Sequence, residues 1–184
     1  MERAIKIYRV INRAKFIIFI LLSYLILLSC MSEESDNLPL EKIVNPSYKT
    51  TISDISIPKF KLGKTYKVSE LPRANAVSRA IYNKKDIEIR EYNSHQDAID
   101  FGEKFALSVS GKDAIVSGDD VMWKEGAKDR RKCVPRAGNS EAGCDQTPRF
   151  GGYLIMGNLI ILCEGLSNEE SLNLCYSFKD ALNP

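Results

Sequence analysis

Residues 153–163 read Tyr153-Leu-Ile-Met-Gly-Asn-Leu-Ile-Ile-Leu-Cys163, and this stretch decides the fold. Two apolar runs, Tyr153–Met156 and Leu159–Cys163, flank the dipeptide Gly157-Asn158, which favours a two-residue turn between antiparallel strands. Because both runs are apolar on both faces, we expect a central hairpin that is covered on at least one side. These eleven residues are too few to cross a bilayer, which takes roughly 20 residues of helix.

A helix is expected directly after this hairpin. Ser167 and Glu170 have the spacing of a capping box, in which the two side chains satisfy the first backbone N–H groups of a helix. An apolar stripe follows at intervals of three or four residues: Leu172, Cys175, Phe178 and Leu182. Cys163 ends the second strand and Cys175 lies on this helix, so a disulfide between them would fasten the helix to the sheet.

Further elements are expected upstream. Residues 86–92 alternate apolar and polar at Ile87 and Ile89, as a half-buried strand does. Ser94 and Asp97 mark the start of a helix. Its apolar stripe consists of Ala98, Ile99, Gly102, Phe105, Ala106 and Val109, and Ser110-Gly111 ends it. Two less regular stretches predict a weak strand over residues 64–68 and a short helix over residues 71–80.

The order of strand, helix, hairpin and helix favours an α+β fold: a small, mostly antiparallel sheet with two main helices packed on one face and disulfide bracing. We expect one domain over residues 63–184. Residues 30–62 have the composition of a tether, because their polar start and three prolines leave little apolar surface to offset the entropy of ordering. Three isoleucines could still dock its far end onto the domain: Ile52, Ile55 and Ile57.

The first 29 residues have the layout of a secretory signal: residues 2–15 hold five basic residues and one acid, and an apolar run follows from Phe16 to Leu28. Leu27-Leu28-Ser29-Cys30 resembles the lipobox of bacterial lipoproteins. This resemblance implies a diacylglycerol on the Cys30 sulfur, cleavage before Cys30 and a chain anchored on a membrane outside the cytoplasm. Two alternatives stay open. One is a retained transmembrane helix, although the 14 residues up to Ser29 fall short of roughly 20, and the other is ordinary secretion.

Loss of the leader changes the charge balance. The whole chain has 26 basic and 24 acidic residues, and the leader takes five basic residues and one acidic residue. The mature part therefore keeps 21 basic and 23 acidic residues, a formal charge of −2. A nearly neutral chain gives no reason to expect a nucleic-acid partner.

Four cysteines follow Cys30: Cys133, Cys144, Cys163 and Cys175. In an oxidising compartment an even number indicates two disulfides, with three possible pairings. We favour Cys133–Cys144 and Cys163–Cys175, because each closes a loop of about 10–13 residues and would contribute about 3 kcal/mol. A zinc site and free thiols are the alternatives, but zinc ligands usually include a C-x-x-C pair and none occurs here. We expect no metal and no cofactor.

The segment from Val121 to Phe150 is long for a connection without secondary structure, and such segments often carry function. Six basic residues fall between Lys124 and Arg136, with only Glu125 and Asp129 as acids. We expect this segment to contact an anion such as a phospholipid head group, a polyanionic glycan or an acidic partner. The expected contact residues are Trp123, Lys124, Lys128, Arg130, Arg131, Lys132 and Arg136. The alternatives are a solvated basic face and a core position for Trp123.

Recognisable catalytic motifs do not occur in this sequence: it has no P-loop, no G-x-G-x-x-G and no G-x-S-x-G. The only histidine, His95, lies at a helix start without a nucleophile beside it. The main hypothesis is therefore a non-enzymatic binding lipoprotein. The alternative is a small hydrolase for an anionic envelope substrate, in which carboxylates act with two arginines. Its residues would be Asp119, Asp120, Glu125, Arg130 and Arg131; solvated loop acids are the simpler interpretation.

Five short stretches between about residue 64 and residue 182 are similar to one group of proteins. They are Glu70-Leu71-Pro72, Glu88-Ile-Arg90, Ser94-His95-x-Asp97-Ala98, Trp123-Lys124-Glu125-Gly126, and Gly157-Asn158 through Leu162-Cys163-Glu164. In this order they resemble an uncharacterised family of domains in bacterial extracytoplasmic lipoproteins. The resemblance implies a lipoprotein with a single domain, and it brings no activity or substrate.

Overall fold

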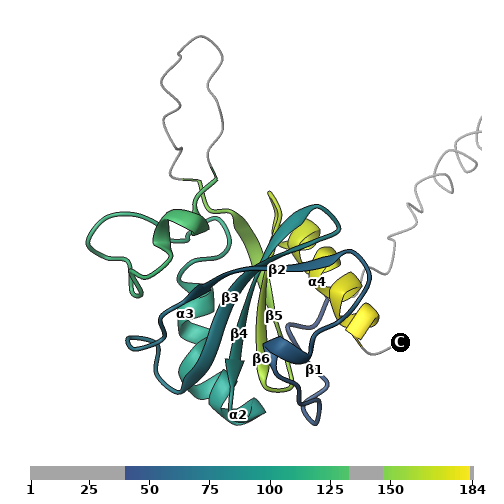
Figure 1. Cartoon of the computed structure of the whole chain (residues 1–184). Helices are drawn as coiled ribbons and strands as arrows, with labels where there is room; N and C mark the ends of the chain where they lie inside the picture. The colour runs from purple at the N-terminus through teal and green to yellow at the C-terminus, as the bar shows by residue number, and fades with distance from the viewer. Residues whose placement is uncertain (1–39, 133–146, 183–184) are drawn as a thin grey trace, which may run out of the picture. The chain divides into compact units, whose positions relative to one another are not determined.

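The computed structural model describes residues 40–132 and 147–182. They form an α+β fold around one six-stranded sheet, with the strand order β1-β5-β6-β4-β3-β2 (Figure 1). All neighbouring strands are antiparallel except β1 and β5, which are parallel. The strands are β1 (Ile43–Val44), β2 (Phe60–Tyr66), β3 (Ala74–Tyr82), β4 (Lys85–Tyr92), β5 (Phe150–Met156) and β6 (Leu159–Glu164). The helical elements are η2 (Ile52–Asp54), α2 (His95–Asp97), η3 (Ala98–Gly102), α3 (Glu103–Leu107), η4 (Ala127–Arg130) and α4 (Asn168–Leu182).

The predicted hairpin is confirmed and lies inside the sheet. β5 and β6 are joined by Gly157-Asn158, with Met156 paired to Leu159 across the turn. Gly157 has a φ of 53°, the left-handed backbone that favours glycine at the first position of a type II′ turn. Every residue of β5 is buried, and in β6 only Glu164 is partly exposed. The hairpin thus forms the centre of the core.

The two main helices lie on opposite faces of the sheet, so the expectation that both pack on one face was wrong. Cys175 and Phe178 of α4 join a core cluster with Ile161 and other residues of one sheet face. Ala98 and Ala106, upstream in the chain, join a second cluster with Ile160 and the other face. The physical reason lies in the strands: residues alternate between faces, and a hairpin that is apolar at nearly every position needs a cover on both.

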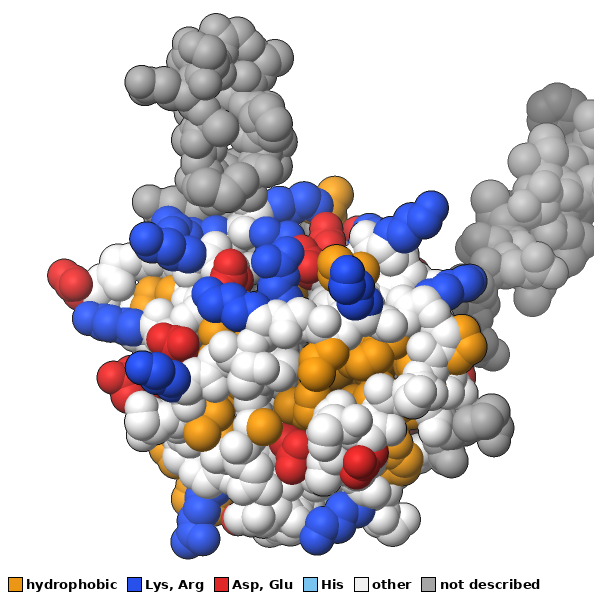
Figure 2. All heavy atoms as spheres, in the orientation of Figure 1, with side chains coloured by type: hydrophobic (Ala, Val, Ile, Leu, Met, Phe, Trp, Pro, Cys, Tyr) orange, Lys and Arg blue, Asp and Glu red, His pale blue; other side chains and the backbone are white. Residues whose placement is uncertain are grey.

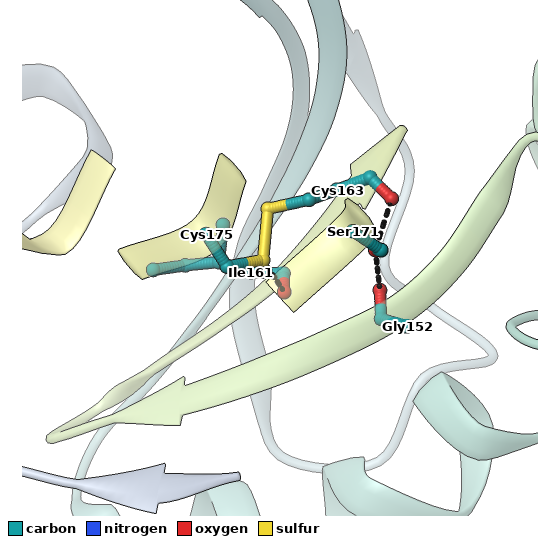
Figure 3. The surroundings of a disulfide bond; sticks show 5 residues. All are labelled: Gly152, Ile161, Cys163, Ser171 and Cys175. Carbon is teal, nitrogen blue, oxygen red and sulfur yellow. Dashed lines mark hydrogen bonds between the residues drawn. A yellow bond between two sulfur atoms is a disulfide. The ribbon is translucent and has the colours of Figure 1, made fainter. Parts of the chain in front are cut away.

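α4 is bonded to the sheet by the predicted disulfide (Figure 3). The Cys163–Cys175 bond joins the end of β6 to the middle of α4, with a Cα–Cα distance of 5.7 Å. Ser171 adds two hydrogen bonds, since its hydroxyl lies 2.5 Å from the carbonyl oxygen of Cys163 and 3.1 Å from that of Gly152. Half of the predicted capping box is present: the Ser167 hydroxyl accepts from the Glu170 N–H at 3.1 Å, while the Glu170 carboxylate accepts from the N–H of Leu166, one residue earlier than expected, at 2.9 Å.

The predicted upstream helix is present but not uniform. The Ser94 hydroxyl accepts from the Asp97 N–H at 3.0 Å, as the sequence predicted. The helix then runs through α2, a π-helical turn (η3) and α3. Gly102 belongs to the π turn, and an added Cβ there would lie 2.5 Å from the ring of Tyr92. The helix therefore packs closely against β4.

The predicted short helix over residues 71–80 was wrong, because this stretch contributes to β3. Its partner is β4, which follows after the two-residue turn Asn83-Lys84, where both residues have positive φ. Such a turn matches the twist of an antiparallel pair, and the long ladder it starts outweighs the helix propensity of the alanines. The weak strand expected at residues 64–68 lies a few residues earlier, as β2.

Residues 40–62 pack on the domain and do not extend from it as a tether, so the expected domain boundary at residue 63 is too late. Ile52 and Ile55 are only 5% and 8% exposed, and β1 pairs with β5. Asn158 holds this segment, because its side chain bonds the backbone N–H and C=O of Thr50 at 3.0 and 2.9 Å. The buried isoleucines supply the apolar surface that the polar residues around them lack. Residues 30–39 of the expected tether lie outside the described residues.

Candidate functional site

The segment 121–132 covers one face of the sheet beside strands β2, β3 and β4. Trp123 is 1% exposed and belongs to a core cluster with Tyr66, Val77 and Phe105. Its ring meets that of Tyr66 edge-on, with 6.2 Å between the centroids. This basic segment is therefore fixed to the sheet by an apolar anchor near its start.

A second anchor is electrostatic, and we call it the buried triad: Glu88, Arg90 and Arg130. Glu88 and Arg90 are two residues apart on β4, so their side chains share a face. One oxygen of Glu88 accepts from Nε of Arg90 at 2.8 Å, and the other accepts from Nε of Arg130 at 2.9 Å. All three side chains are at most 1% exposed. The triad joins the segment to the sheet without contact with solvent.

Arg130 makes further contacts that hold the shape of the segment itself. Its Nη1 donates to the carbonyl oxygens of Trp123 and Glu125 at 3.3 and 2.8 Å. Its guanidinium lies 4.1 Å from the centre of the Trp123 ring, and that of Arg90 lies 5.3 Å from it. Cation–π contacts of desolvated guanidinium groups are worth about 2 kcal/mol. Arg130 therefore connects sheet, indole ring and loop backbone in one place.

The triad carries an excess of positive charge, because one carboxylate faces two guanidinium groups. Desolvation lowers the pKa of Arg130 and the charge of Arg90 acts in the same direction, while Glu88 opposes both. In Trp123 and the two arginines of the triad, Trp123 Nε1, Arg90 Nη1 and Arg130 Nη2 have no hydrogen-bond partner among the described residues, and Arg90 Nη2 has only an ion-pair contact with Glu88 at 2.8 Å. Glu88 is therefore the one group in the triad that compensates the buried positive charge.

A second, less buried network extends from the triad towards the surface. Asp86 accepts from Arg79 through two hydrogen bonds of 2.8 Å and also pairs with Arg149. Asp129 accepts from Lys64 and from the Tyr66 hydroxyl, both at 2.9 Å. Burial alone would raise the pKa of Asp129, but these two hydrogen bonds and the nearby cations lower it below its usual range. Burial and the bond to Asp129 raise the pKa of Tyr66.

The structure divides the predicted anion-contact residues into two groups. Trp123 and Arg130 are interior residues and cannot touch an external ligand in this conformation, because their polar and aromatic groups are used inside the domain. Lys124 and Lys128 are exposed, and Arg131 and Lys132 are half-buried. Lys132 lies 3.5 Å from Glu164. Arg136, together with Cys30, Cys133 and Cys144, lies outside the described residues.

The residues of the alternative hydrolase do not converge. Asp119 and Asp120 are exposed on a loop, whereas Arg130 is buried on Glu88. Glu125 accepts from the backbone N–H of Lys67 at 3.3 Å and lines a pocket of about 330 Å³ with Trp123 and Lys124. The other lining residues of that pocket are Lys67, Ser69 and Glu70. His95 bonds the carbonyl oxygen of Gly157 at 2.9 Å and so holds its helix against the hairpin.

Sequence reasoning missed Glu88 and the network of Arg79, Asp86 and Arg149. Charged residues alternate with Ile87 and Ile89, a pattern that normally indicates a solvent-facing side of a strand. A weak signal was present, since β6 carries Ile160 and Leu162 on the same face as those charges. The pairing of Glu88 with Leu162 and of Arg90 with Ile160, however, is known only from the structure, in which β4 and β6 are neighbours.

Neither a metal centre nor a membrane span is found in the part of the chain that the structure describes. Over residues 40–132 and 147–182, no group of three His, Cys, Asp or Glu side chains could hold a metal ion. Over the same residues, no helix has the length and apolar character to cross a bilayer.

Comparison with known proteins gives one match. The model of a family described as a family of unknown function (DUF6810) matches residues 51–184. No match is found among curated proteins. None is found among solved structures.

Proposed function

The chain belongs to the family of unknown function (DUF6810), whose description brings no activity, and we therefore propose a function from the site itself. We propose that the mature protein is a lipoprotein held on a membrane outside the cytoplasm by lipid on Cys30. We further propose that its domain binds an anionic partner without catalysis. The contact surface is the basic rim, defined as Lys124, Lys128, Arg131 and Lys132.

Two features support the anchor. The basic leader, the short apolar run and Leu27-Leu28-Ser29-Cys30 form the pattern of a lipoprotein signal. The Cys163–Cys175 disulfide supports an oxidising compartment, because such bonds are rare where cytosolic thiol systems keep cysteines reduced. Two or more acyl chains would give stable attachment, where a single chain is marginal.

The binding proposal rests on which basic side chains of this region form ion pairs with carboxylates and which do not. Asp86 and Asp129 already pair with cations outside the rim, and Glu164 pairs with one rim residue, Lys132. By contrast, no carboxylate of the described residues lies within 4.0 Å of the side-chain nitrogens of Lys124, Lys128 or Arg131. Figure 2 shows many Lys and Arg side chains on the upper part of the visible face, with a few Asp and Glu side chains among them.

The buried triad supports this function further, because it holds the rim in place. Arg130 bonds the backbone of Trp123 and Glu125 on both sides of Lys124. A contact surface held in place before binding loses less conformational entropy when it binds. Near an anionic membrane, each basic residue would contribute about 1 kcal/mol of attraction.

The binding proposal is tested with residues 31–184, which lack the lipid, and vesicles of phosphatidylserine and phosphatidylcholine. We expect sedimentation with anionic vesicles that weakens steeply with salt. Lys124→Glu with Lys128→Glu should lower the affinity at least about 30-fold, because two attractions are lost and repulsion is added. The matched control is Lys49→Glu with Lys104→Glu, which makes the same charge change at two exposed lysines elsewhere. Equal losses of affinity in both double variants, or an affinity that does not change with salt concentration, would refute specific binding of anionic vesicles at the basic rim.

The anchor is tested separately in a bacterial envelope. Wild-type chain should partition into the detergent phase and incorporate labelled fatty acid, and Cys30→Ala should do neither. Processing and partitioning that survive Cys30→Ala would refute the lipid anchor while leaving the basic rim untouched.

A further inference from the structure

β5 is an edge strand over part of its length. β1 pairs with it only at Ile155 and Met156. At the other end, the N–H of Gly111 donates to the carbonyl oxygen of Phe150 at 2.9 Å. Between these contacts, residues 151–154 have no strand on the side away from β6, within the part of the chain that the structure describes.

The backbone of this gap offers hydrogen-bonding groups. The N–H of Ile155 points away from β6, because it donates to Lys42 O at 2.7 Å. Along a strand, alternate residues direct their N–H and C=O groups to the same side. The N–H and C=O of Tyr153 therefore point away from β6 as well. Because Tyr153 is only 3% exposed, an added strand could bond both groups only after neighbouring side chains move aside.

A pocket of about 960 Å³ borders the first half of this gap, at Gly151 and Gly152. Its lining includes Phe150, Gly151 and Gly152 of the strand. Leu107 and Leu166 also line it and are among the most exposed large apolar residues, at 57% and 77%. Exposed apolar side chains beside a pocket are typical of a site that binds a partner.

The opposite edge of the sheet, β2, has features that prevent an added strand from pairing with it. β2 carries the exposed lysines Lys61 and Lys64, and its register with β3 shifts between Leu62 and Thr65. Charged side chains and irregular register are the usual means by which proteins prevent pairing at an edge. Residues 151–154 read Gly-Gly-Tyr-Leu and carry no charged side chain, and the one irregularity of β5, a register shift against β6 between Phe150 and Gly152, lies at the start of this stretch.

We propose that the open edge of β5 binds an extended peptide of a partner protein, which adds a short strand beside residues 151–154. An apolar side chain of that peptide would pack on Leu107 and Leu166. Lys42 and Lys112 line the pocket against one acid, Asp113, so acidic residues flanking the apolar one are favoured. The pairing of β1 with the same edge supports this occupant, because it is already an extended chain added beside β5.

The test uses the full chain in detergent micelles and a capped heptapeptide, Glu-Val-Glu-Leu-Glu-Val-Glu. Hydrogen–deuterium exchange, resolved at the Tyr153 amide, should slow at least about ten-fold when the peptide binds, since this N–H gains a backbone partner. The same peptide N-methylated at alternate residues lacks the N–H groups of a strand and should give no protection. Absence of protection by the first peptide, or equal protection by both, overturns the proposal.

Variants give a second, independent readout. Leu107→Lys with Leu166→Lys should weaken peptide binding at least about ten-fold, because the apolar contact is lost at two exposed positions that do not hold the fold together. Leu62→Lys with Met122→Lys is the matched control, at side chains that are 43% and 48% exposed and do not line the pocket. Equal loss in the control overturns the assignment of the site. Charge reversal at Lys124 and Lys128 should leave peptide binding unchanged. The proposal of peptide binding at β5 and the proposal of anion binding at the basic rim can therefore be refuted separately.

Discussion

The charges of the buried triad predict which of two substitutions, Glu88→Gln or Arg130→Met, destabilises the protein more. Glu88 is the single carboxylate facing Arg90 and Arg130, and all three are at most 1% exposed. Glu88→Gln raises the local charge from one positive unit to two, whereas Arg130→Met lowers it to zero. Removing one partner of a buried ion pair costs about 3–5 kcal/mol. We therefore expect Glu88→Gln to lower the free energy of unfolding by about 4 kcal/mol.

Arg130→Met should cost less, although it removes more hydrogen bonds. It loses bonds to Glu88 and to the carbonyl oxygens of Trp123 and Glu125, at about 1 kcal/mol each. Part of this loss is offset, because a buried excess charge disappears and Glu88 still pairs with Arg90. We expect a net cost of about 2 kcal/mol. Replacing all three residues by Leu, Leu and Met should return stability to within about 2 kcal/mol of wild type.

The assay is urea unfolding at neutral pH, followed by the fluorescence of Trp123. This residue is the only tryptophan of the chain, and both guanidinium groups lie over its ring, so the signal comes from the triad itself. Equal m-values would show that the variants unfold from similarly compact states. A smaller loss for Glu88→Gln than for Arg130→Met would refute the view that Glu88 compensates an excess of buried positive charge.

Two further predictions concern the disulfide and the outer network. Cys163→Ala with Cys175→Ala should lower the free energy of unfolding by about 3 kcal/mol, and reduction of the wild-type protein should reproduce this loss in the same urea assay. Asp129→Asn should destabilise the protein at neutral pH, and this difference should shrink as pH falls below about 4. The sign follows from the lowered pKa of Asp129: its contribution is complete above the unfolded pKa and is lost as pH falls through the folded one. A difference between Asp129→Asn and wild type that stays constant in an acid unfolding series would contradict this sign.

Elements with local signals could be predicted from the sequence. The turn at Gly157-Asn158, the capping box of Ser167 and Glu170, and the Cys163–Cys175 pairing each involve residues close together in the chain. The face on which each helix packs could not be predicted, because an apolar hairpin accepts a cover on either side. The helix expected over residues 71–80 failed for a related reason: the ladder of β3 with β4 decides its conformation, and the alanines alone do not indicate it.

The candidate site was only partly predictable, because its central contact is long-range. Arg130 and Glu88 are 42 residues apart, and the pattern around each suggested a solvated charge. The interpretation of Trp123 as a core residue was considered from the sequence, and the structure supports it. What the sequence did show correctly was an excess of basic residues after Trp123. Which of them reach the surface depends on Arg130 turning inward, and no periodicity indicates that.

The buried triad is better understood as a device for positioning than as a source of stability. Apolar residues of similar volume would often fill such a space at equal or lower free energy. However, an apolar residue at position 130 could not bond Glu88 and the carbonyl oxygens of Trp123 and Glu125 at once. These bonds define one conformation of the segment, with Trp123 inside and Lys124 and Lys128 outside. If positioning is the role of the triad, the variant with all three residues replaced should stay folded and yet bind anionic vesicles more weakly than wild type. Wild-type affinity in that stable variant would show that the rim does not depend on the triad.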